Sequence, residues 1–87
     1  MKVDRTGAFK KDFEKLSREL KRAAEKQIVQ LLIDHSHPSL RLEAIVGHKG
    51  IFSVRVNDRY RISLNFVEDG VILLRRVLDH DDLYANP

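Results

Sequence analysis

The chain has 87 residues, the size of one domain, and no cysteine, which excludes disulfides and thiolate-bound zinc as sources of stability. Its formal net charge is +3, from 16 Lys and Arg against 13 Asp and Glu, a mild bias towards polyanionic partners. No segment approaches the ~20 apolar residues of a membrane span, and none resembles the apolar run of a signal peptide. We therefore expect residues 1–87 to form a single soluble, cytoplasmic domain with no membrane partner.

The first part of the chain predicts an edge strand followed by two helices. Residues 2–5 are the candidate strand, and Thr6 is a plausible N-cap for a first helix. Apolar residues recur at helical spacing in that helix, at Phe9, Phe13, Leu16 and Leu20. Ser17 is a cap or break point that starts a second helix. The apolar positions of the second helix are Ala23, Ala24, Ile28, Leu31 and Leu32. The residues before Pro38 end it, because a residue that precedes proline disfavours the α region.

The second half of the chain changes to the period of strands. Apolar residues alternate or run together in four segments, residues 40–46, 51–56, 60–67 and 71–78. The connections at residues 47–50, 57–59 and 68–70 are short and rich in turn-forming residues, which permits only antiparallel neighbours. The predicted fold class is α+β, with two N-terminal helices packed on an antiparallel meander sheet of about four strands.

The hairpin of residues 53–63 has two different faces. Val54, Val56, Tyr60 and Ile62 form the apolar face, and Ser53, Arg55, Arg61 and Ser63 form the other. A three-residue loop at 57–59 places Arg55 directly opposite Arg61. Like charges in that position destabilise an antiparallel pair, so the arrangement suggests that an anion binds between them. Guanidinium groups suit phosphate because they donate in a planar fork.

The next hairpin leaves two registers open. A three-residue loop at 68–70 pairs Ser63 with Arg75 and Leu64 with Leu74, whereas a two-residue turn brings Arg76 to that place. In the first register Arg55, Arg61 and Arg75 share one sheet face, which is expected to be open to solvent because the helices cover the other.

The tail of residues 79–84 carries the groups best suited to proton transfer. His80 is a candidate general acid, and the aspartates beside it should favour its protonated form. Tyr84 follows one helical turn later, so its ring is expected beside His80, where it can stack on a base. Surface charge and ordinary core packing are the alternative interpretations of these residues. No metal site is expected, because contiguous residues such as His80, Asp81 and Asp82 rarely converge on one ion.

These segments together resemble the RelE/ParE superfamily of type II toxins, and the RelE-type ribosome-dependent mRNA interferases more than the ParE gyrase poisons. The resemblance covers nearly the whole chain. It is carried by the Phe9…Phe13…Leu16 helix, the segments 37–42, 52–57 and 60–62, and His80-Asp81-Asp82-Leu83-Tyr84. Several lines of the family end in Gly-Thr-His-Asp-x-x-Tyr, where this chain has Val77-Leu78-Asp79-His80 before its aspartates.

The resemblance implies roles for individual residues. Arg61 matches the arginine that contacts the scissile phosphate, and Arg55 lies on the face near the attacking 2′-hydroxyl. His80 matches a proposed general acid, and Tyr84 matches the aromatic residue that orients the mRNA base. Arg75 or Arg76 corresponds to a second phosphate-binding arginine, and Glu43 is a candidate general base. The predicted RNA-binding residues are Arg41, Lys49, Arg59 and Arg75.

The reaction that the family implies is transesterification by the ribose 2′-hydroxyl in the ribosomal A site, without metal or cofactor. The implied partners are the ribosome, mRNA and a cognate antitoxin that holds the toxin inactive. The sequence leaves two other functions open. One is a toxin of the same fold that poisons DNA gyrase, and the other is a non-toxic module that binds RNA or protein through the basic sheet.

Overall fold

The structure, a computed structural model, describes residues 2–87, which form one five-stranded sheet in the order β1-β5-β4-β3-β2. The strands are β1 (Lys2–Arg5), β2 (Glu43–Ala44), β3 (Phe52–Arg55), β4 (Tyr60–Val67) and β5 (Val71–Asp79). Strands β2 to β5 form the predicted antiparallel meander. The edge strand β1 lies parallel to β5, so the sheet is mixed rather than wholly antiparallel.

Both predicted helix caps are present. Thr6 Oγ1 accepts a hydrogen bond from the Phe9 N–H at 3.0 Å at the start of α1 (Gly7–Glu14). Ser17 Oγ accepts one from the Leu20 N–H at 3.2 Å at the start of α2 (Arg18–Ile33). These bonds satisfy donors that lack a partner in the first turn. Leu20 therefore belongs to α2 and not to the first helix, where its spacing suggested it.

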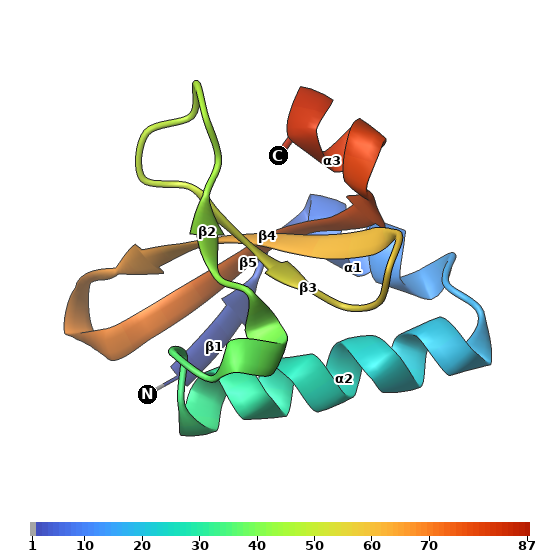
Figure 1. The fold of residues 1–87 in the computed structure, drawn as a ribbon, viewed down its shortest axis with the longest axis horizontal. Coiled ribbons are helices and arrows are strands. Elements are labelled where there is room, and N and C mark those ends of the chain that lie inside the picture. The colour runs from blue at the N-terminus through green and yellow to red at the C-terminus, as the bar shows by residue number, and fades with distance from the viewer. Residues whose placement is uncertain (1) are drawn as a thin grey trace.

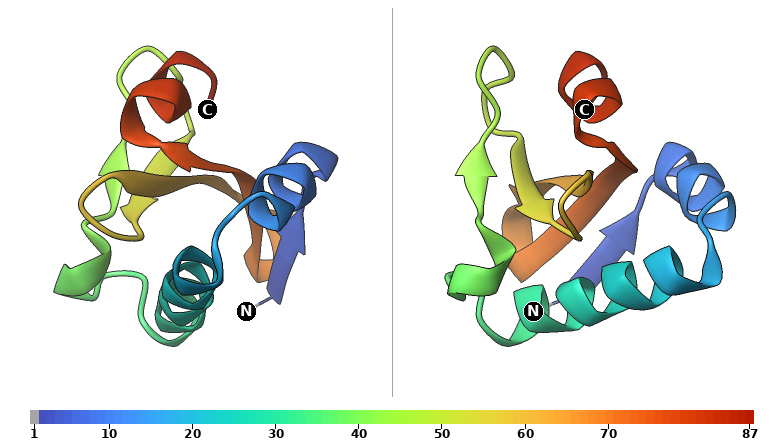
Figure 2. Two further views of the ribbon diagram at one scale, coloured as in Figure 1. Left: turned by 90° about the vertical axis from the view of Figure 1, so that its right-hand side faces the viewer. Right: turned by 45° about the vertical axis from the view of Figure 1, so that its right-hand side comes forward.

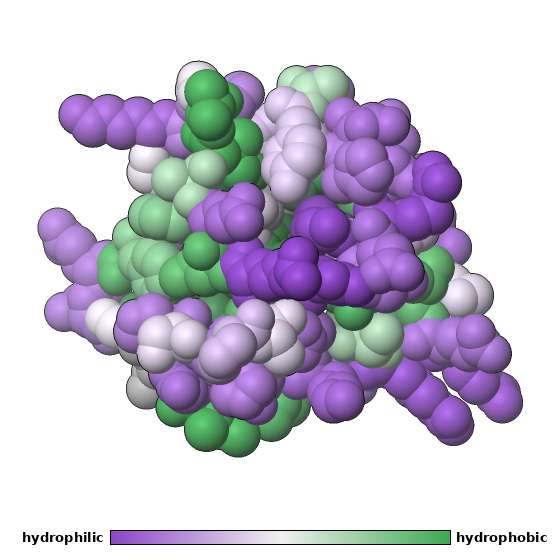
Figure 3. All heavy atoms as spheres, viewed as in Figure 1, coloured by the Kyte–Doolittle hydropathy of each residue, from purple (hydrophilic) through white to green (hydrophobic). Residues whose placement is uncertain are grey.

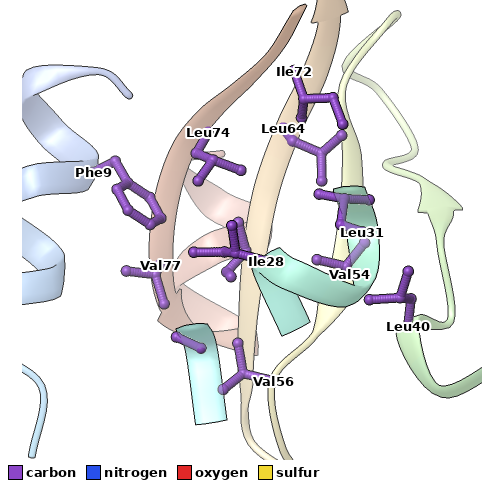
Figure 4. Close-up of a cluster of buried hydrophobic side chains, with 12 residues drawn as sticks. Phe9, Ile28, Leu31, Leu40, Val54, Val56, Leu64, Ile72, Leu74 and Val77 are labelled. Carbon is purple, nitrogen blue, oxygen red and sulfur yellow. The ribbon is translucent and has the colours of Figure 1, made fainter. Parts of the chain in front are cut away.

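The core lies between the sheet and the first two helices. Helix α2 spans one face of the sheet, and α1 packs beside β5 (Figures 1 and 2). Apolar residues from both helices interlock there with β3, β4 and β5, and the short helix η1 (Pro38–Leu40) adds one more (Figure 4). The fully buried members are Phe9, Ala24, Leu31, Leu40, Val54, Ile62, Leu64, Ile72, Leu74 and Val77.

The β4–β5 ladder contains a bulge that the sequence did not predict. Val67 and Val71 close a three-residue loop, η2 (Glu68–Gly70), and Leu64 pairs with Leu74 as expected for that loop. The next pair is Ser63 with Arg76, so the expected pairing of Ser63 with Arg75 is wrong. Arg75 is the extra residue of the bulge. Its carbonyl oxygen accepts a hydrogen bond from Thr6 Oγ1 at 2.7 Å, where β1 ends and α1 begins.

Beyond this bulge, the edge of β5 is no longer paired with β1 and is contacted by helix α1 instead. Asp12, which is 7% exposed, accepts hydrogen bonds from Arg76 Nε at 2.7 Å and Arg76 Nη2 at 3.0 Å. The same carboxylate accepts the backbone N–H of Val77 at 3.2 Å. The Asp12 side chain thus provides an acceptor for the backbone N–H of Val77 at the edge of β5. The ion pair with Arg76 holds α1 against the sheet.

The second face of the sheet is partly covered, contrary to the open face expected from the sequence. Helix α3 (His80–Ala85) lies over β4 and β5, opposite α2 (Figures 1 and 2). Leu83 of α3 is fully buried, and Ser53 and Ser63 beneath this layer are 3% and 0% exposed. This face is covered because residues 80–85 form a short helix that packs Leu83 against the sheet.

The strand predicted over residues 40–46 is much shorter. Pro38–Leu40 forms η1, and Arg41 ends it with a φ of 47° in the left-handed region. Only Glu43–Ala44 pairs with β3. The chain then forms a loop whose base is closed by the Ile45 N–H bonding to the Ile51 carbonyl at 2.9 Å. Among residues 2–87, no helix has the length and apolar character needed to span a bilayer.

Candidate RNA-binding site

Arg55 and Arg61 are Cα partners across β3 and β4, as the hairpin pattern predicts. The Arg55 guanidinium forms an ion pair with Asp58 in the hairpin turn. Arg61 Nη1 donates to the carbonyl oxygens of Asn57 at 2.5 Å and Tyr60 at 3.0 Å. The Asp58 side chain is 90% exposed, so this ion pair is weak and an incoming phosphate can replace it.

The turn between the two strands has a fixed conformation. Asn57 Oδ1 accepts hydrogen bonds from the Arg59 N–H at 3.0 Å and the Tyr60 N–H at 2.8 Å. Such Asx turns stabilise tight hairpins. The arginines on either side of the turn therefore have a defined backbone position. A strongly hydrophilic band crosses the middle of this side of the molecule, in the region of β3 and β4 below α3 (Figure 3).

His80 and Tyr84 lie together on α3, as the helical spacing predicts. Their ring centroids are 6.4 Å apart with an interplanar angle of 44°. His80 Nδ1 lies 2.9 Å from Asp81 Oδ1. The His80 side chain is 38% exposed and Tyr84 is 43% exposed, so both rings are accessible to a ligand.

A hollow of about 380 Å³ separates α3 from the short strand β2. Tyr84 lines one side, and Glu43 and Ser53 line the other. Ser53 lies two residues before Arg55 on β3, so both side chains belong to the same sheet face. The hollow thus lies on the face that carries the arginine pair. The candidate base Glu43 and the candidate stacking residue Tyr84 border one space.

Arg59 connects the hairpin turn to the start of α3. Its Nε and Nη2 donate to Asp79 Oδ2 at 3.0 and 2.8 Å, and its carbonyl oxygen accepts the His80 N–H at 2.7 Å. Hydrogen bonds from the Arg59 side chain and the Asp81 N–H hold the pKa of Asp79 below its ordinary value of 3.8. The hydrogen bond to Asp79 also raises the pKa of the Arg59 guanidinium.

The other predicted RNA-binding residues lie outside this group. Lys49 is exposed in the loop of residues 45–51. Arg41 lines a separate hollow with His35 and His37. Arg75 lines a third hollow with Arg76, and its guanidinium donates to Asn65 Oδ1 at 3.4 Å and the Pro87 carbonyl at 3.3 Å.

One group of potential metal ligands occurs among residues 2–87. Ligand atoms of Asp79, His80 and Asp81 all lie within 4.8 Å of one another, so these contiguous residues do converge. Both oxygens of Asp79 already have partners, since Arg59 bonds Oδ2 and the Asp81 N–H bonds Oδ1 at 3.1 Å. These contacts give the Asp79 carboxylate a structural role at the start of α3.

Two arginines have acidic partners that the sequence does not predict. Asp12 pairs with Arg76 across 64 residues and Asp79 with Arg59 across 20, so no local pattern indicates either pair. Asp79 is the one of these residues whose structural role a local pattern indicates. An aspartate directly before a helical segment is a typical N-cap, and Asp79 does cap α3.

Neither the scan against protein-family models nor the search of curated proteins gives a match. Solved structures do match over nearly the whole chain. A chain of the RelB–RelE antitoxin–toxin complex from Methanococcus jannaschii has a TM-score of 0.75 at 23% identity, covering 98% of this chain and 100% of that one. The YoeB/ParE toxin from Agrobacterium tumefaciens has a TM-score of 0.80 at 16% identity, covering 92% and 99%. YafQ from Escherichia coli has a TM-score of 0.70 at 19% identity, covering 93% and 94%. The chain therefore has the fold of the RelE/ParE superfamily toxins.

Proposed function

We propose that this chain is the toxin of a type II toxin–antitoxin system and that it cleaves mRNA in the ribosomal A site. The observation that carries the proposal is the placement of His80 and Tyr84 on α3, above the sheet face on which Arg55 pairs with Arg61. The shared fold supports it, because the similar structures include toxins in complex with their antitoxins.

The proposed reaction assigns each group a chemical task. The ribose 2′-oxygen attacks the adjacent phosphorus, and the bond from phosphorus to the 5′-oxygen breaks. Arg61 stabilises the negative charge that develops on the phosphate oxygens, with Arg55 beside it. His80 gives a proton to the leaving 5′-oxygen, and Glu43 is the candidate that takes the proton of the 2′-hydroxyl.

The remaining site residues bind and orient the RNA. The half-exposed ring of Tyr84 borders the hollow and offers a surface on which a base stacks. The exposed Lys49 and Arg41 supply non-specific attraction to the RNA backbone, which depends on salt. The ribosome supplies much of the positioning of the mRNA. A cognate antitoxin blocks the toxin until it is removed.

The test is cleavage of a defined mRNA by the purified protein in the presence and absence of ribosomes. Primer extension is expected to show cuts in the A-site codon only when ribosomes are present. Arg61→Ala and His80→Ala are each expected to lower the single-turnover rate by about 100-fold or more. Arg22→Gln, on the exposed side of α2, is the matched control and should keep the wild-type rate. Absence of cleavage by the wild-type protein would overturn the proposal. DNA damage with intact mRNA would favour gyrase as the target instead.

A further inference from the structure

Arg59 joins the two halves of the candidate site through two different contacts. Its guanidinium holds Asp79 through two hydrogen bonds, and its carbonyl oxygen holds the His80 N–H. Arg59 also lies two residues before Arg61, in the turn that Asn57 fixes. The same turn therefore determines where the arginine pair lies and where α3 begins.

We propose that Arg59 is a positioning residue, which holds His80 at a fixed distance from the Arg55–Arg61 pair so that the acid and the phosphate-binding groups act on one phosphate. This inference rests on the proposed function. It adds a structural role to Arg59, for which the sequence predicts only RNA binding.

The short length of α3 explains why such a residue is needed. The helix has six residues, and Leu83 is its one fully buried side chain. His80 is its first residue and 38% of its side chain is exposed, so the burial of Leu83 does not itself hold the imidazole. Asp79 immediately precedes His80, and a link to Asp79 restrains the His80 backbone directly.

The chemistry of the pair suits this task. Asp79 uses Oδ1 to cap α3 through the Asp81 N–H and Oδ2 to accept both bonds from Arg59. A guanidinium donates two bonds in a plane, whereas an ammonium group lacks that fixed geometry. The Arg59 side chain is 72% exposed, so the pair contributes little to the stability of the whole domain. Its effect on site geometry is therefore separable from an effect on folding.

The experiment measures single-turnover cleavage on programmed ribosomes, affinity for those ribosomes and the melting temperature. Arg59→Gln is expected to lower the cleavage rate by roughly 100-fold, the cost of a misplacement of about 1 Å, with affinity and melting temperature nearly unchanged. Arg59→Lys should recover part of the rate. Asp79→Asn, which keeps a capping side chain, should lose as much as Arg59→Gln. Arg22→Gln is the control for loss of an exposed arginine.

A double-mutant cycle decides whether Arg59 acts through His80. In a His80→Ala background, Arg59→Gln is expected to cause little further loss of rate. The same fold loss in both backgrounds would overturn the proposal, and so would a full cleavage rate in Arg59→Gln. A loss confined to ribosome affinity would also overturn it, in favour of direct RNA binding.

A measurement on the protein alone keeps this inference distinct from the proposed function. Hydrogen exchange of the His80 backbone amide is expected to be faster in Arg59→Gln than in the wild type at equal melting temperature. Unchanged exchange would overturn the positioning role even if the wild type cleaves mRNA. Faster exchange in a protein that fails to cleave would overturn the nuclease function while confirming that Arg59 anchors α3.

Discussion

Arg55 on β3 faces Arg61 on β4, and among residues 2–87 the one carboxylate that bonds either guanidinium is that of the exposed Asp58. Arg76, on the neighbouring strand, has a buried partner in Asp12. The sheet thus contains arginines used in two ways. Arg76 holds α1 on the sheet, whereas the proposed function uses Arg55 and Arg61 to bind an anion, at little cost in broken contacts.

Asp12→Ala is expected to destabilise the domain strongly. The change leaves Arg76 and the Val77 N–H without their acceptor at the edge of β5. Loss of one partner of a buried pair costs about 3 kcal/mol, the lower end of the usual range, because the Arg76 side chain is 31% exposed. Urea unfolding measures the difference. Glu14→Ala, on the exposed side of the same helix, is the control. A loss below about 1 kcal/mol would contradict a structural role for the pair.

Ser63→Ala is expected to leave stability unchanged or to raise it by up to about 1 kcal/mol. Ser63 Oγ is fully buried and has no hydrogen-bond partner among residues 2–87. Removal of an unpartnered hydroxyl eliminates a desolvation cost without opening a large cavity. Thermal and urea unfolding of the variant check this. A clear destabilisation would show that the hydroxyl has a partner, such as bound water.

Asp58→Asn is expected to strengthen the binding of single-stranded RNA. The substitution removes the carboxylate that pairs with Arg55 and leaves Arg61 unchanged. An exposed pair contributes at most about 1 kcal/mol, so the dissociation constant should fall by about fivefold or less. Fluorescence anisotropy at two salt concentrations gives the affinity and its salt dependence. Weaker binding by Asp58→Asn would contradict an anion site at the arginine pair.

The link between Arg59 and Asp79 should appear in the dependence of stability on pH. Folding lowers the pKa of Asp79 below 3.8, so the carboxylate stabilises the folded state above that value. The contribution is lost as the pH falls through the lower pKa of the folded state. The difference in unfolding free energy between wild type and Arg59→Gln should therefore be small, because the pair is exposed, constant near neutral pH, and smaller still in acid. A difference that does not change with pH would contradict the ion pair.

The sequence predicts those parts of the fold that local patterns determine. Thr6 and Ser17 cap the helices as expected, and the hairpin of residues 53–63 has the predicted register because its turn is short and its apolar face is clear. The spacing of His80 and Tyr84 likewise places their rings together once α3 forms.

The parts that the sequence does not predict depend on contacts between distant segments. The bulge at Arg75 forms where Thr6 bonds to β5, and residues 71–74 do not alternate, so they give no signal of it. The parallel pairing of β1 with β5 is also a contact between distant segments, because the two strands are separated by α1, α2 and three other strands. Helix α3 covers the second face of the sheet, and Leu83 is the one residue of that helix whose apolar character indicates it. A single apolar residue is too little to predict that a helix packs there.

The chemical nature of the RNA ends tests most directly whether this sheet face performs transesterification by a 2′-hydroxyl. Purified protein is incubated with ribosomes programmed with one mRNA, and the same mRNA is prepared with 2′-deoxyribose at the cleaved nucleotide. Cleavage of the first mRNA should give a 2′,3′-cyclic phosphate and a 5′-hydroxyl, with Arg61→Ala nearly inactive and the deoxy substrate intact. Ends with a 3′-hydroxyl and a 5′-phosphate, or equal cleavage of the deoxy substrate, would contradict the proposed chemistry.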